Sequence, residues 1–263
     1  MTYIQLGAEE CVAGLNSWRI SHVFGTAELR RRYSRSRLGQ GWLTLSMAAT
    51  ATLLALVWTV LWRAPVAIVL PHVIIGIVLW NFISAIITDA THLSQSVTQI
   101  IFNQHVAFST FAYAVIYRNL IVFAHNSIII VVVMAVFPVF KLAELPLFLP
   151  AVALTSVCGF FVALITAMVC ARFRDLQHVV ASALQFGFYV TPVLWLPEAL
   201  PSDYQWILKV NPFTCFLEIL RGPLLGAAPS AMSWVASAGL TIVVGLLALY
   251  LTGRWRNRLV YWL

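Results

Sequence analysis

The chain has 263 residues, of which 61% are hydrophobic and only 10% are charged, with 16 Lys and Arg against 9 Asp and Glu. Soluble domains carry about 25% charged residues, so this composition excludes a soluble globular protein and predicts an integral membrane protein. The net charge of +7 would suit nucleic acid, but the arginines stand at the ends of apolar runs, where they determine topology and contact anionic lipid instead.

Residues 1–37 are predicted to stay outside the hydrocarbon. They lack the continuous apolar core of a cleavable signal peptide. Residues 8–36 repeat apolar side chains at helical spacing among charged ones, which is typical of an interfacial amphipathic helix; an ordinary cytoplasmic tail is the alternative. Five arginines follow one another closely between Arg30 and Arg37. Because dense arginine marks the cytoplasmic side, this run sets the orientation of residues 38–263.

Six uncharged apolar runs follow, and each reaches the roughly 20 residues that a helix needs to cross the hydrocarbon. They predict membrane spans at about 38–62, 65–88, 119–140, 145–171, 176–197 and 233–253. An even number of spans puts both termini on one side. With cytoplasmic termini, twelve of the 16 basic residues lie inside and four lie outside, as the positive-inside rule requires.

The inner connection between the second and third spans is too long to be a simple turn. Within it, Val97, Ile100 and Ile101 fall on one helical stripe with polar residues opposite. This pattern predicts a short amphipathic helix, which either docks to a partner or lies on the bilayer.

The outer connection between the fifth and sixth spans predicts two short helices over about 202–221. Ser202 and Gln205 form a capping-box pattern at the start of the first helix. Asn211 caps the second, with Pro212 at its first position. The pair either dips into the outer leaflet as a hairpin or lies flat as a cap, and Glu218 stands three residues before Arg221, within pairing reach.

The chain shows no pattern for catalysis or metal binding. Its two lysines follow no glycine-rich loop, so no nucleotide site is predicted. All 9 acidic residues lie at or outside span ends, so ion coupling lacks a carboxylate within the membrane. His125 is the polar candidate inside a span, in either a functional or a hydrogen-bonded structural role. The four cysteines are predicted to be packing residues. The chain therefore conducts passively or takes energy from a partner on the cytoplasmic side.

Five segments together resemble the type-2 permeases of ABC transporters that export polysaccharides. They occur in the family's order and cover nearly the whole chain. The segments are residues 32–39 (RYSRSRLG) with Trp42, 117–121 (YRNLI) with His125 and Asn126, 171–175 (ARFRD), 191–193 (TPV), and 211–213 (NPF) followed by 220–224 (LRGPL).

The resemblance implies an all-α homodimer of six-helix subunits with two copies of a separate nucleotide-binding ATPase, which holds the ATP and Mg that this chain does not bind. Such transporters move lipid-linked O-antigen, capsular or teichoic-type glycans across the bacterial inner membrane, so this subunit is expected not to be an enzyme. The resemblance also places a coupling helix, which contacts the ATPase, at Ser94, Val97, Ile100, Ile101, Asn103 and Gln104. Members often carry a basic residue and a proline after that helix, where this chain has residues 103–108 (NQHVAF).

Two sets of residues are candidates for substrate contact. The first could pair bidentately with the lipid pyrophosphate, although topology alone also explains arginines there: Arg30, Arg31, Arg35 and Arg37. The second lies near the expected outer gate, where aromatic rings either stack on sugars or anchor at the interface: Tyr189, Trp195, Tyr204, Trp206, Phe213 and Phe216, with Arg221.

The leading interpretation is thus the permease of an ATP-driven exporter of undecaprenyl-pyrophosphate-type polysaccharide. A type-2 permease for a drug or small lipid is the alternative, followed by an ion-coupled carrier or a channel.

Overall fold

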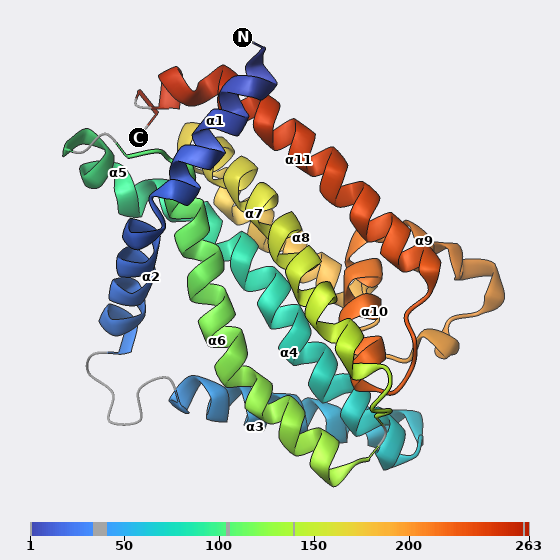
Figure 1. Ribbon diagram of the computed structural model, residues 1–263. Coiled ribbons are helices and arrows are strands. Elements are labelled where there is room, and N and C mark those ends of the chain that lie inside the picture. The colour runs from blue at the N-terminus through green and yellow to red at the C-terminus, as the bar shows by residue number, and fades with distance from the viewer. Residues whose placement is uncertain (1, 34–40, 104–105, 139, 260, 263) are drawn as a thin grey trace.

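The computed structural model describes residues 2–33, 41–103, 106–138, 140–259 and 261–262, without the side chains of residues 32, 33, 99 and 101–103. All regular elements within these residues are helices (Figure 1). The long ones are α3 (Gly41–Trp62), α4 (Val66–Thr91), α6 (Ser109–Val136), α7 (Phe148–Arg172) and α11 (Ala231–Leu259). The shorter ones are α1 (Tyr3–Asn16), α2 (Trp18–Tyr33), α5 (Leu93–Asn103), α8 (Leu176–Val190), α9 (Trp206–Val210) and α10 (Pro212–Leu224), with 3-10 turns η1 (Leu145–Leu147), η2 (Pro197–Ala199) and η3 (Ser202–Tyr204).

Among the described residues, five helices are long and apolar enough to cross a membrane: α3, α4, α6, α7 together with η1, and α11. They match predicted spans one to four and six, and they support a multi-pass membrane protein. The predicted fifth span, 176–197, is helical only over the 15 residues of α8, which rise about 22 Å and fall short of a hydrocarbon core of about 30 Å. The helix ends at Thr191 in an extended conformation because Pro192 follows it. Six spanning helices therefore stay a prediction.

Both termini lie at one end of the bundle, together with α1 and α5 (Figure 1). This end is called the terminal end below, and the other the opposite end. In place of the single helix predicted over 8–36, the structure has two helices, α1 and α2, which are separated at Ser17. α1 packs on α11 and α6, and a Cβ atom at Gly7 would overlap the carbonyl of Leu249. Glycine is needed there because the two backbones meet.

α6 begins at Ser109, earlier than the predicted third span, because α1 and α2 cover its first turns. The backbone N–H of Phe108, the residue before α6, donates to the Glu10 carboxylate (2.8 Å). The hydroxyl of Ser21 in α2 donates to the Thr110 carbonyl (2.8 Å). These contacts with α1 and α2 hold the first turns of α6, which precede Arg118, the charge after which the predicted span begins.

α4 is the centre of the bundle. In its most apolar 18-residue window 67% of the residues are buried, against 11% in α3. α4 packs against α3, α6, α7, α8 and α10. α3, by contrast, leaves apolar side chains such as Leu53, Val60 and Leu61 exposed. An uncovered apolar face of this size meets lipid or another protein surface.

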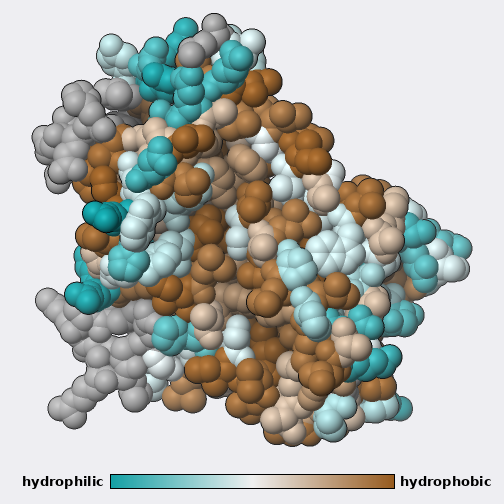
Figure 2. All heavy atoms as spheres, in the orientation of Figure 1, coloured by the Kyte–Doolittle hydropathy of each residue, from teal (hydrophilic) through white to brown (hydrophobic). Residues whose placement is uncertain are grey.

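The surface divides into polar and apolar regions (Figure 2). Hydrophilic side chains gather at the terminal end around α1, and again near the connection between α8 and α10, whereas the surface between them is mostly hydrophobic. Lipid tails offer no hydrogen-bond partners, so this arrangement suits a bilayer core between two wet layers.

The predicted helix pair over 202–221 is present in altered form. The capping box of Ser202 and Gln205 is wrong: Pro201 precedes a 3-10 turn there, and the first helix is the five-residue α9. The cap at Asn211 is confirmed, because its side-chain oxygen accepts from the N–H of Phe213 (3.0 Å) at the start of α10. α10 then continues past Arg221 to Leu224.

Candidate functional site

α8 carries a row of polar side chains that is exposed. Its spacing of three or four residues places the row on one face of the helix: His178, Ser182, Gln185 and Tyr189. The buried residues of α8, Leu184 and Gly187, lie on the other side, where the helix packs against α4 and α7. Polar side chains at membrane depth avoid lipid and face water or protein. This row, called the α8 polar face below, is therefore suited to water or a second protein surface rather than to lipid.

The aromatic residues predicted for the passage fall into two groups. Tyr189, Tyr204 and Trp206 are exposed, each by more than half. Phe216 is buried, and together with Phe213 it lines an apolar pocket of about 170 Å³, so its place in a passage stays a prediction. Phe213 is half-buried against Trp80, with ring centroids 5.2 Å apart. Trp195 is also half-buried, and its indole N–H donates to the Tyr189 carbonyl (3.1 Å).

Arg221 is buried in α10 and fastens the connection after α8 to α4. Its Nη1 donates to the carbonyl of Pro192 (2.7 Å) and lies 3.0 Å from Nε2 of His72 in α4. The same His72 nitrogen lies 3.0 Å from the carbonyl oxygen of Trp195. The close approach depends on Gly76, where a Cβ atom would come 2.9 Å from the Val193 carbonyl oxygen. We call Arg221, His72 and the 192–195 backbone the arginine latch.

The predicted pair between Glu218 and Arg221 is wrong. Glu218 accepts hydrogen bonds from the N–H of Ser230 (2.9 Å) and the hydroxyl of Ser233 (2.6 Å) at the start of α11, while Arg221 points into the bundle. Burial lowers the pKa of Arg221 to about 10, with the charges of Glu198 and Glu218 opposing the shift. The guanidinium is therefore still charged at neutral pH.

A polar groove of about 630 Å³ opens at the terminal end, beside α5. We call it the α5 groove, and its lining residues are Arg31, Ser94, Gln95, Ser96, Thr98, Ala171, Arg174 and Trp262. The ring of Trp262 stacks on the guanidinium of Arg172, whose Cζ lies 5.0 Å from the ring centroid. This contact holds Trp262 against the end of α7. Two arginines and the polar face of α5 make this groove suited to an acidic partner.

The predicted coupling residues divide between this groove and the interior. Ser94 lines the groove. Val97 is completely buried and Ile100 is half-buried against the core, so this part of the apolar stripe attaches α5 to its own chain. Gln104 and the side chains of Ile101 and Asn103 lie outside the described residues.

The arginine run is described only at its start. Arg30 and Arg31 are exposed near the end of α2, and Arg31 lies 3.8 Å from the Glu28 carboxylate. Arg35 and Arg37 lie outside the described residues. Their proposed contact with a lipid pyrophosphate stays a prediction.

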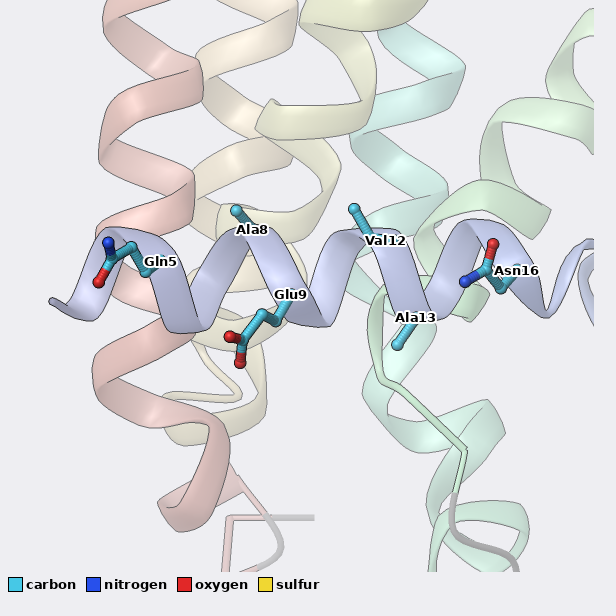
Figure 3. A pocket seen from close by; sticks show the side chains of 6 residues that line it. All are labelled: Gln5, Ala8, Glu9, Val12, Ala13 and Asn16. Carbon is cyan, nitrogen blue, oxygen red and sulfur yellow. The ribbon is translucent and has the colours of Figure 1, made fainter. Parts of the chain in front are cut away.

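The outward face of α1 is shown in Figure 3. All six labelled residues belong to this helix and line a shallow hollow: Gln5, Ala8, Glu9, Val12, Ala13 and Asn16. Small buried residues, Gly7, Cys11 and Gly14, hold the inner face against the bundle. Ile4, Val12 and Leu15 are exposed along one flank.

All four cysteines are free and buried, as predicted for packing residues. Burial raises the pKa of Cys11 to about 11, and the charge of Glu10 adds to the shift.

His125, the polar candidate of the third span, is exposed, and its Nδ1 lies 2.8 Å from the carbonyl of Ile121 in the same helix.

Sequence reasoning missed the partners of two charged or polar residues within helices. His72 gave no signal beyond being polar in an apolar run. Arg118, treated as a topology determinant, is buried between two carboxylates, those of Glu28 and Asp89. The sequence did contain a signal for this cluster, because acidic Glu28 and Asp89 and basic Arg118 all stand near the ends of predicted helices.

Comparison with known proteins agrees with these features. The chain matches the family model described as "ABC-2 type transporter" over residues 24–225. It is 23% identical over 200 residues to the O-antigen export system permease protein RfbA of Klebsiella pneumoniae, an alignment that covers 74% of this chain and 76% of that protein. A second protein of the same description and organism is 28% identical over 75 residues, which are 27% of this chain and 29% of that protein. Since the family match runs from α2 through α10, the chain belongs to the ABC-2 type transporter family.

Proposed function

We propose that this chain is the permease subunit of an ATP-driven exporter that moves lipid-linked polysaccharide, of the undecaprenyl-pyrophosphate type, across the bacterial inner membrane. Membership of the ABC-2 type transporter family supports the transport role, and the O-antigen export description of its relatives supports the substrate class. The chain is then a non-enzymatic subunit, and two copies of a partner ATPase bind and hydrolyse the ATP with Mg.

The α8 polar face is the observation that carries this proposal. A glycan is hydrated over most of its surface and needs a polar path through the hydrocarbon. One chain packs its core around α4 and leaves α3 and the α8 polar face uncovered. A second copy related by a twofold axis would enclose a path between the two polar faces, with Tyr189 positioned to stack on sugar rings.

We count α8 and the residues that follow it as the sixth crossing. α8 rises about 22 Å, and the chain continues from it through a turn and a bend. The residues concerned are 191–196, which the arginine latch holds against α4. Six crossings place both termini in the cytoplasm, consistent with the charge distribution.

The terminal end then faces the ATPase and the inner headgroups. The exposed apolar flank of α1 (Ile4, Val12, Leu15) lies in the interface, beside the polar side chains Gln5, Glu9 and Asn16 of the same helix. The α5 groove receives the ATPase, and the arginines from Arg30 to Arg37 meet anionic lipid and the substrate pyrophosphate.

Deletion of the gene tests the proposal. In a deletion strain, lipid-linked glycan accumulates inside the cell and surface glycan disappears; a plasmid copy restores both. Affinity purification of the restored protein yields two permeases with two ATPase subunits. Normal surface glycan in the deletion strain would exclude a polysaccharide exporter and favour a permease for a drug or small lipid.

A further inference from the structure

Arg118 joins three helices through one guanidinium. It lies in α6, is 5% exposed, and pairs with Glu28 of α2 and with Asp89 of α4, the latter at 2.6 Å. Asn119 extends the cluster, because its side-chain N–H group donates to the same Asp89 carboxylate (2.9 Å) and to the Val115 carbonyl (2.9 Å). We call Glu28, Asp89, Arg118 and Asn119 the Arg118 cluster.

The two carboxylates of the Arg118 cluster depend on the positive charge of Arg118. Glu28 and Asp89 are both largely shielded from solvent, with side chains 18% and 16% exposed. Two shielded carboxylates repel each other; Arg118 contacts both, while the exposed Arg31 approaches Glu28 at 3.8 Å. Neutralising either carboxylate therefore frees one helix from the shared guanidinium and leaves the other pair intact.

The position of the cluster gives it a role beyond packing. Asp89 stands near the end of α4, and α5, whose polar face lines the α5 groove, begins at Leu93. Glu28 stands near the end of α2, which leads through the arginine run to α3. A displacement of α5 can therefore pass to α2 through the end of α4 and the ion pairs of Arg118. A second contact, between Ser21 and the Thr110 carbonyl, holds α2 to α6 further along.

One donor of the guanidinium is unused. The Nε–H of Arg118 is buried and has no hydrogen-bond partner among the described residues. A guanidinium has donors on three nitrogens in one plane. A change in the side-chain torsions of Arg118 can replace an Nη contact by an Nε contact while both ion pairs persist, so the cluster can change geometry without releasing either helix.

We propose that Arg118 is a positioning residue that transmits movement of α5 to α2 and so makes ATP hydrolysis productive for transport. The inference depends on the proposed function, since it assumes that an ATPase acts on α5. It predicts that α2, the end of α4 and α6 move together as one rigid body during transport. When either carboxylate is neutralised, the helix that carries it should move separately from the other two.

The test uses the purified permease–ATPase complex in liposomes, with undecaprenyl-pyrophosphate-linked oligosaccharide as the transported probe. ATP hydrolysis and oligosaccharide transport are measured separately. Glu28→Gln and Asp89→Asn are each expected to keep hydrolysis within about twofold of the wild type and to lower transport per ATP at least tenfold. The matched control is Glu10→Gln, which weakens the attachment of α1 at Phe108 without touching the cluster, and leaves transport per ATP unchanged.

A covalent link separates transmission from mere stability. Cysteines replacing His22 of α2, which is exposed, and Tyr117 of α6, which is half-buried, stand where the two ring centroids lie 5.0 Å apart; joined by a short bifunctional reagent, they attach α2 to α6 independently of Glu28. This link is expected to restore transport per ATP in Glu28→Gln. Unchanged transport per ATP in Glu28→Gln and Asp89→Asn, or failure of the link to restore it, would overturn the inference while the proposed function stands. A wild-type permease that transports the oligosaccharide without any ATPase would overturn both.

Discussion

The guanidinium of Arg221 lies 3.0 Å from the imidazole Nε2 of His72, although the two residues are 149 positions apart in the chain. The contact joins α10 to α4. The same guanidinium nitrogen also donates a hydrogen bond to the Pro192 carbonyl. Each partner comes from a different part of the opposite end, so the arginine latch determines where the segment after α8 lies against the central helix.

Loss of the arginine latch should destabilise the folded permease. Arg221→Met leaves the buried Pro192 carbonyl without its donor, at a cost of about 1–3 kcal/mol. We expect the midpoint of thermal unfolding in detergent to fall by several degrees. Lys209→Met removes one positive charge from an exposed position in α9 and serves as the control, with no change expected. Equal midpoints for both variants would show that the latch contributes nothing to stability.

The α8 polar face should be essential for transport, whereas the neighbouring apolar face should not. Gln185→Leu removes one hydrogen-bonding group, worth about 1 kcal/mol or more, from the path of a hydrated substrate. We therefore expect export to fall about five- to tenfold at equal protein level. Val179→Leu, on an exposed apolar part of the same helix, should export normally.

Water access distinguishes a passage from a lipid-facing surface on α8. A cysteine at Gln185 should react with a membrane-impermeant maleimide, and a cysteine at Val179 should not. Reaction at Val179 alone would reverse the assignment of the two faces.

Charge reversal in the α5 groove should slow association with the ATPase. Arg174→Glu places a carboxylate where an acidic partner segment is expected, and rim charges act mainly on the association rate. We expect the rate to fall about tenfold at low salt and by less at high salt, because salt screens exposed charges. Arg256→Glu, an exposed position in α11 outside the groove, is the matched control. If anionic liposomes rather than ATPase lose binding in Arg174→Glu, the groove binds lipid.

Cys11 should resist alkylation near neutral pH. With the pKa raised from 9.0 to about 11, the thiolate fraction at pH 8 is about 100-fold smaller than for an ordinary thiol. In a variant that retains this cysteine alone, iodoacetamide labelling should become measurable only as the pH approaches 11. Because the raised pKa favours the protonated thiol in the folded state, its contribution to stability is present below pH 9 and is lost as the pH rises to 11. Rapid labelling at pH 8 would show that Cys11 is accessible.

The extent of prediction from sequence differs between features. The apolar runs located the five helices that are long and apolar enough to cross a membrane among the described residues, because hydropathy is a property of consecutive residues. The Asn211 cap was also predictable, since Pro212 and Phe213 lie next to it in the chain. The capping box at Ser202 and the pair of Glu218 with Arg221 were wrong, because local spacing permits such contacts without deciding whether a better partner comes from elsewhere.

By itself, the sequence determined that this chain belongs in a membrane, where its long helices fall, and which end concentrates positive charge, because these properties follow from residue types along short stretches. The packing of helices against one another decided that Val97 points inward, that Arg118 holds two carboxylates, and that Arg221 meets His72. Packing also left the α8 polar face uncovered. Such relationships join residues that are remote in the chain, and burial in a shared interior, rather than sequence spacing, selects each partner.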